Sequence, residues 1–547
     1  MRKKQGWTCR KLSAGFAAAA LPVTKERLAA LRSLLADSSE MADELSRLAS
    51  GLNNVAAPEG QPFLFTGSLP DNERLLRGTF QDCEDIRFRA FSAGGRQALL
   101  VYLFGMTDVT LLEKNVLETL MAPDSNQQLT ITISALVERL VTSAAIEVCA
   151  RTDQATTFIM SGSALLLIDG NAEGLIVGAT KHVKRAVEES KVEGLARGPH
   201  DAFTETLSDN IVLLRRRSRD PQLKVRIVQL GIRSKTELAM VYVADLVKAG
   251  LVAEVERRLS RIKVDQVTLS ATVEEWIIDH PWSPFPQTDT TEIPESLMAA
   301  LYEGRIGLIL DNTPVALIVP CTLTTLLQNI EDYTLQPVVV TLVRLTRYFC
   351  AIIGALLPAV YIAIVSYHPG MLPTTLAISV AEIRARTPYP AYMEVLIMEF
   401  IIEVFQEAVL RLPRKISGAA SIVGGFVIGT TIVQSGLVNA MLVVATAGTA
   451  IASYTMPSYN LSLALRWLRV PLIFLASILG FYGIMLGYIA IMIHMCSLRS
   501  FGESYMGGLF DITLLEDMQD KLVRLPARWM TSRPKEFGSR DRTRAGD

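Results

Sequence analysis

The sequence is poor in the residues that build disulfide frameworks and metal centres. Its 547 residues include six cysteines and five histidines, which are widely scattered. No two cysteines have C-x-x-C spacing, and no histidine has a second metal-ligating residue four positions away. A secreted disulfide scaffold, a metal site and other cofactors are therefore not expected.

Motifs that carry catalysis are missing as well. The chain has no G-x-x-x-x-G-K-[ST] phosphate loop, no G-x-G-x-x-G after a predicted strand and no G-x-S-x-G. Its charges balance, with 54 Lys and Arg against 55 Asp and Glu and a net charge of −1. Because the catalytic motifs are missing, we do not expect an enzyme. Because no positive excess is available for phosphates, we do not expect a nucleic-acid binder.

What the chain does have is apolar sequence. Half of its residues are apolar and only 20% are charged. The mean hydropathy of +0.30 is high for a soluble protein, and this apolar content argues against disorder. The composition predicts a chain that is part soluble and part embedded in a membrane.

Residues 1–60 begin with a basic stretch and an alanine-rich run. The run resembles a signal peptide, but it is short and Lys25 and Arg27 follow it, which favours a retained cytoplasmic tail. Leucines then recur at helical spacing around residues 28–35 and 45–52. We expect a basic tail followed by an amphipathic helical hairpin.

Residues 60–335 mix β-rich runs with helical patterns. Apolar runs on either side of Gly94-Gly95 predict a first β-hairpin, and a second is expected to turn through Asp169-Gly170-Asn171. The strands that we expect are Ile86–Phe91, Ala98–Leu103, Ala164–Ile168 and Gly174–Val177.

The same pattern recurs further along the chain. Residues 101–103 are echoed 140 residues later, and residues 165–177 are echoed 142 residues later, by 307–319. Two echoes at nearly one offset indicate an internal duplication, although short hairpins can also resemble one another by chance. We expect two α/β lobes, residues 61–195 and 196–336, and a cleft between such lobes is a natural ligand or partner site. The second lobe then contains strands Val225–Leu230 and Leu238–Val243.

A distinctive segment joins the two predicted lobes. Gly198-Pro199 suggests a turn, Asp201 can cap the helix that follows, and Glu205 then lies on its first turn. The cluster Arg215, Arg216 and Arg217 ends this helix, where cations suit the helix dipole. Two readings stay open for the arginines: a structural role, or a contact with lipid headgroups, a partner's acidic patch or an anionic ligand.

Residues 281–294 hold four prolines and cannot form a helix or a central strand. We expect a loop that presents Trp282 and Phe285 to a neighbouring surface.

The composition changes after residue 337, where we predict an all-α multi-pass membrane domain over residues 337–498. Three of its five apolar segments are long enough to span a bilayer, and a basic tail, residues 499–547, follows. Two basic loops, Arg411–Lys415 and the one with Arg466 and Arg469, place the amino terminus in the cytoplasm. Five spans, however, would put the basic tail outside. One segment therefore does not cross, or one crossing is hidden. The segments are Tyr348–Val365, Tyr392–Leu410, Ala419–Val433, Leu437–Tyr454 and Val470–Met495.

The second segment carries Glu399, Glu403 and Glu407, which recur every four residues and share one helical face. A charged side chain at mid-membrane costs about 2.5–3.5 kcal/mol on insertion scales, so this face needs water, cations or protein. An acidic ring in a cation pore is one interpretation. The alternatives are an interfacial amphipathic helix, or carboxylates bonded to Arg384, Arg386 or Arg411.

Seven separated motifs occur along the chain: G-P-H-D-A-F-T-E (198–205), N-I-V-L-L-R-R-R (210–217), T-E-x-P (291–294), E-D-Y (331–333), H-P-G-M-L-P (368–373), R-L-P-R (411–414) and C-S-L-R-S-F-G (496–502). In this order, over about residues 75–510, they resemble the A subunit of GerA-type spore germinant receptors. The family-motif residues are Gly198, Pro199, Glu205, Asn210, Glu292 and Pro294. His200 and Ile293 stand where the family usually has a basic residue, which questions a charge role there. A related sporulation protein of the dipicolinate-channel operon shares much of this text.

The resemblance implies a receptor complex in the spore inner membrane, with a B-type membrane subunit and a C-type lipoprotein subunit. Such complexes sense nutrients and trigger release of monovalent cations and dipicolinate. The A subunit is expected to form a homo-oligomer in membrane lipid and to conduct ions, while the B subunit is the stronger candidate for nutrient binding. The leading hypothesis is thus a subunit of a nutrient-gated cation channel. A non-conducting scaffold for the B and C subunits is the main alternative, and a solute transporter ranks third.

Overall fold

The computed structural model describes residues 63–121, 145–181, 198, 201–385, 387–507 and 520–544. The predicted extension at residues 1–60 lies outside them, as do Pro199 and Arg386. From Leu64 to Asp547 the chain forms one compact unit.

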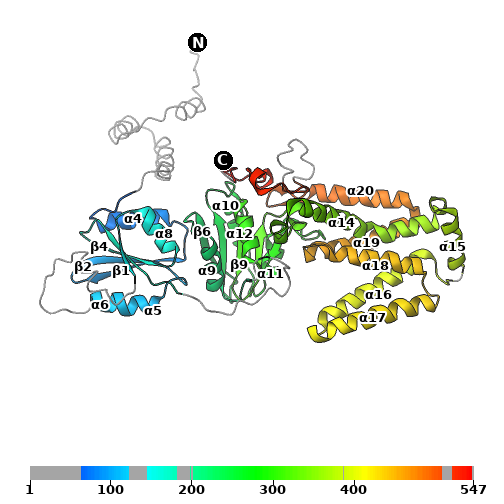
Figure 1. The fold of residues 1–547 in the computed structure, drawn as a ribbon, viewed down its shortest axis with the longest axis horizontal. Helices are drawn as coiled ribbons and strands as arrows, with labels where there is room; N and C mark the ends of the chain where they lie inside the picture. The colour runs from blue at the N-terminus through cyan, green and yellow to red at the C-terminus, as the bar shows by residue number, and fades with distance from the viewer. Residues whose placement is uncertain are drawn as a thin grey trace, which may run out of the picture. The chain divides into compact units, whose positions relative to one another are not determined.

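The first half of this unit contains an antiparallel sheet with strand order β1-β2-β4-β5-β3. The four predicted strands are confirmed, and β4 and β5 are buried throughout because every residue in them is apolar or glycine. Helices α4 and α8 cover one face of the sheet, and α5 and α6 cover the other (Figure 1). The bounds are β1 Ile86–Ala93, β2 Arg96–Leu103, β3 Ile146–Cys149, β4 Ala164–Ile168, β5 Gly174–Val177, α4 Leu69–Thr79, α5 Val109–Leu112, α6 Glu118–Met121 and α8 Thr152–Met160.

A second antiparallel sheet has the order β6-β7-β9-β10-β8, the same arrangement as the first. Helices α9 and α12 pack on one face, and α10 and α11 pack on the other. The repeated strand order confirms the predicted pair of duplicated α/β lobes. The bounds are β6 Leu223–Leu230, β7 Thr236–Val243, β8 Asp289–Thr291, β9 Ile306–Leu310, β10 Ala316–Val319, α9 Leu207–Arg217, α10 Leu251–Leu259, α11 Ser270–Ile277 and α12 Pro294–Tyr302.

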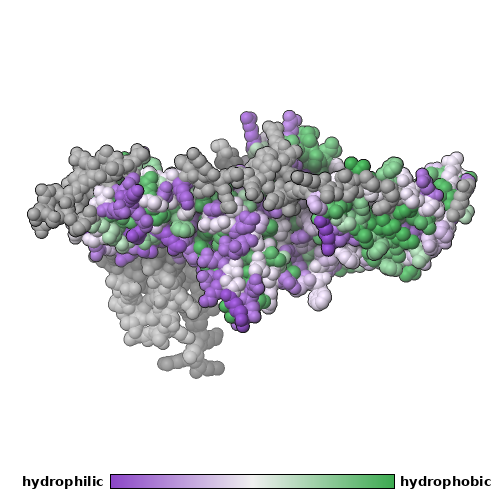
Figure 2. Space-filling model, turned by 90° about the horizontal axis from the view of Figure 1, so that it is seen from below, coloured by the Kyte–Doolittle hydropathy of each residue, from purple (hydrophilic) through white to green (hydrophobic). Residues whose placement is uncertain are grey.

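The part of the chain after the second lobe is helical, and apolar residues dominate its surface (Figure 2). Helices α14 and α19 are long and apolar enough to cross a bilayer, while α18 and α20 are apolar but shorter. The bounds are α14 Pro337–Ser366, α15 Thr374–Arg384, α16 Ala391–Arg411, α17 Arg414–Gln434, α18 Ala440–Tyr454, α19 Tyr459–Leu479 and α20 Phe481–Ser497.

The fifth predicted segment, Val470–Met495, is not one helix: Gly480 divides it between α19 and α20. Gly480 has φ +61° and ψ −138°, a conformation that is essentially restricted to glycine. A Cβ at this position would lie 3.0 Å from Cγ of Tyr367. The two helices pack against each other, so the predicted segment is a pair of packed helices rather than one continuous helix.

The carboxyl-terminal segment returns to the second lobe. The Arg540 backbone N–H donates to the Leu246 carbonyl at 3.0 Å, and Nε of Arg533 donates to the Tyr302 carbonyl at 2.8 Å. The described tail, residues 520–544, therefore packs on the second lobe.

Candidate functional site

Arg215 joins the two lobes. Its guanidinium donates to both carboxylate oxygens of Asp85, at 2.6 and 3.0 Å, and to the Leu223 carbonyl at 2.8 Å. Burial by itself lowers the pKa of Arg215, but the Asp85 carboxylate and the nearby Cys83 together more than offset this effect and the pKa is raised. Because Arg215 is fully buried, the proposed contact with a lipid headgroup is wrong for this residue.

The other two arginines of the cluster lie in different surroundings. Arg217 pairs with Asp201 at 3.0 Å and also with Glu295 on α12, whereas Arg216 is exposed. The expected cap at Asp201 was wrong, and so was the place of Glu205 on the first turn, because α9 begins at Leu207 with Thr206 as its N-cap. Asp201 instead pairs with Arg217 at the carboxyl end of that helix. Arg216 is the member of the cluster that remains available to a partner or anion.

Asn210 belongs to a hydrogen-bonded circuit that occurs in both lobes. Its side chain accepts from the Thr204 N–H at 2.7 Å and donates to the Thr204 carbonyl at 2.6 Å. In the first lobe Asn72 bonds Thr66 in the same way, at 2.9 and 2.7 Å. In the second lobe Asp311 accepts from the Leu207 N–H at the start of α9, at 3.1 Å. In the first lobe Asp169 accepts from the Leu69 N–H at the start of α4, also at 3.1 Å.

Other family-motif residues support the same corner of the second lobe. The Glu205 carbonyl accepts from Asn312 at 2.8 Å, and the Glu292 carbonyl accepts from Phe203 at 2.8 Å. Pro294 opens α12, where a missing N–H costs nothing, and Gly198 has φ +151°. In the described residues these contacts shape the loop between the lobes.

The acidic face of α16 lies against α19. Glu399 accepts from Nη1 of Arg469 at 3.3 Å, and Arg469 also donates to the Gly354 carbonyl at 2.5 Å and to the Ser453 hydroxyl. The sequence predicts a basic loop that contains Arg466 and Arg469. That prediction is wrong for Arg469. The structure places it inside α19, buried among four helices.

The next two carboxylates are progressively more exposed. Glu403 lies 3.3 Å from Nη1 of Arg466, which also bonds Gln406 on α16, and its side chain is 50% exposed. Glu407 pairs at 2.5 Å with Arg411, one of the partners left open by the sequence. Arg384 instead donates to the Val365 carbonyl at 3.4 Å. We call Glu399, Glu403, Glu407 and their arginines Arg469, Arg466 and Arg411 the charged seam.

At Arg466, where it faces the second lobe, the charged seam borders a cleft of about 620 Å³. Gln406, Leu410 and Arg466 line the cleft from the helices, and α12 and β8 line it from the second lobe. This cleft is large enough to hold water, ions or a small ligand.

Ion pairs fasten the second lobe to α14. Asp332 accepts from Arg344 at 2.9 Å and from Arg347 at 2.9 Å, and all three side chains are buried. Nη1 of Arg344 also lies 3.2 Å from Asp520 in the tail. The E-D-Y motif thus connects the lobe, the tail and the first long apolar helix.

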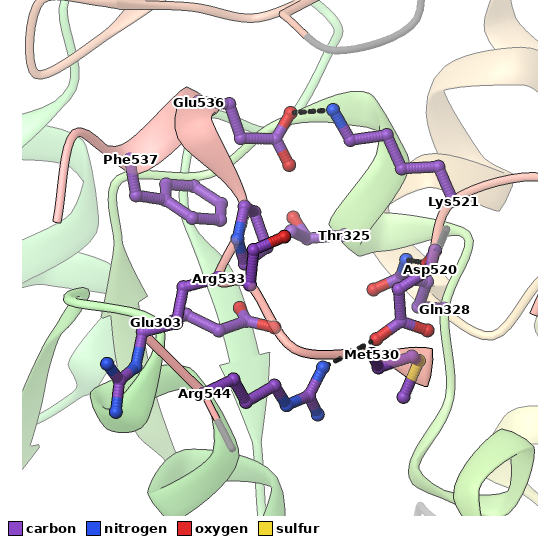
Figure 3. A pocket seen from close by; sticks show the side chains of 12 residues that line it. Glu303, Thr325, Gln328, Asp520, Lys521, Met530, Arg533, Glu536, Phe537 and Arg544 are labelled. Atoms are coloured by element: carbon purple, nitrogen blue, oxygen red, sulfur yellow. Dashed lines mark hydrogen bonds and ion pairs between the residues drawn. The ribbon is translucent and has the colours of Figure 1, made fainter. Parts of the chain in front are cut away.

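A smaller polar pocket lies beside this junction (Figure 3). Glu303, Asp520 and Arg544 point into it, and Arg544 pairs with Asp520 at 3.1 Å. Burial raises the pKa of Glu303 to about 7, although nearby Arg305 opposes the shift. With a volume of about 20 Å³, the pocket has room for one water rather than for a nutrient.

The predicted loop at residues 281–294 presents only one of its two aromatic residues, because Trp282 is exposed and Phe285 is buried. The expectation for Phe285 was wrong, since its ring packs against His494, Met495 and Tyr505 beneath the loop.

The sequence comparisons decide the family. The sequence profile described as "Bacillus/Clostridium GerA spore germination protein" matches residues 74–536. The chain belongs to this GerA family. The resemblance carried by the motifs is thereby confirmed.

Curated relatives of this GerA-family chain match over most of its length. It is 37% identical to the "Uncharacterized membrane protein YfkQ" of Bacillus subtilis, over 86% of this chain and 91% of that protein. It is 34% identical to "Spore germination protein B1" of the same organism, over 87% and 98%. The solved N-terminal domain of the A subunit of the Bacillus megaterium spore germinant receptor GerK3 is 27% identical, with a TM-score of 0.38, over 47% of this chain and 97% of that one. The family and the apolar helices together indicate a membrane-associated spore germination protein.

Proposed function

We propose that this chain is the A-type subunit of a nutrient germinant receptor in the spore inner membrane and forms a nutrient-gated cation channel as a homo-oligomer. The B-type and C-type subunits would be its partners, and the lobes would face the cytoplasm. The observation that carries the proposal is Glu403, which is half exposed on a helix of the apolar half. Because a carboxylate facing lipid is costly, this face calls for water or for a second copy of the chain.

The cleft supports a route for ions. It joins the lobe side of the helical half to Gln406 and Arg466, next to Glu403. Carboxylates near such an entry raise the local concentration of monovalent cations. Gating then requires a nutrient-bound state of the complex that differs in its contacts from the resting state, and the ion pairs between Asp332 and α14 offer a connection from the lobes to the helices.

The experiment is cation efflux from liposomes that contain this chain with its B-type and C-type partners, with and without a panel of nutrients. The test variant carries Glu399→Gln, Glu403→Gln and Glu407→Gln. Its control carries Glu382→Gln, which changes an exposed carboxylate on α15. We expect nutrient-dependent efflux that the triple variant loses and the control keeps. Full efflux from an assembled triple variant would contradict the role of these carboxylates.

A scaffold that organises the B and C subunits without conducting is the second candidate. It is favoured by the arginine partner of each carboxylate, because paired charges can serve packing alone. An assembled complex that binds nutrient but shows no efflux across the panel would support this candidate.

A further inference from the structure

The loop at residues 281–284 projects a single large aromatic residue into solvent. The side chain of Trp282 is 99% exposed, and Pro281 and Pro284 flank it closely. Because prolines restrict the backbone, such a loop loses little further conformational entropy when it binds a partner or a bilayer. A fully exposed tryptophan on a stiff loop is typical of a surface that meets a partner or a bilayer.

The loop is fixed to the lobe-side end of α20. The Ser283 hydroxyl lies 3.0 Å from Nε2 of His494, in the last turn of that helix. Phe285 packs on the same turn, with its ring centroid 6.1 Å from that of His494. One residue earlier, Ile493 is exposed on the apolar surface of the helix. Trp282 is therefore held near the level at which α20 leaves the apolar layer.

A cation without a described partner lies beside the loop. Arg499 follows α20 by two residues and is exposed, and no carboxylate in the described part of the chain pairs with it. It lines a cavity of about 340 Å³ together with His280. The carboxylates of that cavity, Glu254 and Asp279, already pair with Arg258 at 2.7 and 2.6 Å. In the described part of the chain, the guanidinium of Arg499 is therefore free to bind an anion.

We propose that Trp282 and Arg499 form a membrane-interface anchor that binds the bilayer surface on the lobe side. The indole lies at the boundary between headgroups and acyl chains, where tryptophan is favoured, and the guanidinium binds a lipid phosphate. The anchor goes beyond the proposed function, because it holds the second lobe against the membrane whether or not the chain conducts ions.

A second group of exposed aromatic residues also lies at the lobe-facing end of the helical half. Tyr454 and Tyr459 flank the turn between α18 and α19, line the cleft that faces the second lobe, and are exposed. With Trp282 they place exposed aromatic residues at two separate points of the lobe-facing end. An aromatic belt at the membrane interface has this distribution.

The experiment measures tryptophan fluorescence of the full-length chain in liposomes that contain lipids with a nitroxide near the headgroup or deep in the acyl chain. The difference between wild type and Trp282→Phe isolates Trp282. Trp467→Phe and Trp529→Phe give the matched differences for an exposed tryptophan on α19 and an exposed tryptophan in the tail. Phenylalanine at these exposed positions leaves the packed core unchanged.

We expect the shallow nitroxide to quench Trp282 about twofold more strongly than Trp529, and aqueous iodide to quench Trp282 more weakly. Trp467 should respond more to the deep nitroxide. Equal iodide quenching of Trp282 and Trp529, without quenching by either lipid, would overturn the anchor and leave Trp282 as a protein-binding residue.

A second arm tests the cation. Liposomes with anionic lipid should quench Trp282 more than zwitterionic ones, and Arg499→Gln should remove this difference while Arg216→Gln keeps it. If Arg499→Gln leaves the lipid dependence unchanged, Arg499 is not part of the anchor.

Discussion

Arg469 on α19 and Glu399 on α16 form an ion pair inside the helical half, with 3.3 Å between Nη1 and Oε2. The bonds of Arg469 to the Gly354 carbonyl and the Ser453 hydroxyl join α14 and α18 to this pair. One arginine thus connects four helices. The inner end of the charged seam is therefore a fixed structural point, and Glu403 and Glu407 are the members that other groups can reach.

We predict that Arg469→Met lowers stability strongly, by about 3–5 kcal/mol, because it leaves Glu399 buried without its cation. Adding Glu399→Gln should recover part of the loss. Arg411→Met breaks an exposed pair and should change stability by about 0.5 kcal/mol or less. Thermal unfolding of the detergent-solubilised chain measures all three, and equal shifts for Arg469→Met and Arg411→Met would refute the prediction.

Arg215→Ala should also destabilise the chain by about 3–5 kcal/mol, because Asp85 then stays buried without a partner. The neighbouring Arg216→Ala removes an exposed charge and should cost about 0.5 kcal/mol or less. Limited proteolysis of the folded chain reports the separation of the lobes, with faster cleavage near residue 85 expected only for Arg215→Ala. Similar cleavage of both variants would argue against a contact that holds the lobes together.

The pocket at Glu303 predicts a pH dependence. The pKa of this carboxyl is about 7 in the folded chain and ordinarily near 4.5, so the folded state holds the proton more tightly. The contribution of this group to the free energy of unfolding is therefore fully present below about pH 4.5 and falls as pH rises to about 7. Above that pH it stays constant. In thermal unfolding curves recorded across this pH interval, Glu303→Gln should reduce the dependence of stability on pH. An unchanged slope would show that Glu303 does not titrate there.

Gly480→Ala should destabilise the turn between α19 and α20 by about 1–3 kcal/mol, because alanine rarely adopts its backbone conformation. A Cβ at this glycine would also press against Tyr367. Gly418→Ala is the control, since its Cβ would meet no atom within 4 Å. Thermal unfolding should separate the two variants, and a neutral Gly480→Ala would mean that the turn can adopt another conformation.

The sequence predicted the lobes well because their signals are local. Gly94-Gly95 and Asp169-Gly170-Asn171 specify hairpins, and burial on both faces makes β4 and β5 continuous apolar runs. The position of Phe285 was not predictable in this way, because its burial depends on α20, more than 200 residues further along the chain.

The partners of the charged seam were missed for a related reason. Arg466 and Arg469 looked like a basic loop because positive residues at segment ends usually mark the cytoplasmic side. Their spacing of three residues does fit one face of a helix, opposite carboxylates spaced by four. That match could have suggested the pairing, but only the packing of α16 against α19 shows it. Gly480 was likewise hidden inside a continuous apolar run.

The most direct test of the proposed channel is the water accessibility of residue 403 in the assembled receptor. Glu403→Cys, in a chain whose six native cysteines are replaced by serine, is treated with a charged thiol reagent, and Val404→Cys on the neighbouring exposed face of α16 is the control. We predict that position 403 reacts and that cation efflux changes on reaction, while position 404 stays unreactive because it faces lipid. If position 403 reacts only with an apolar, membrane-permeant reagent, the seam is not in contact with water and the channel account is contradicted.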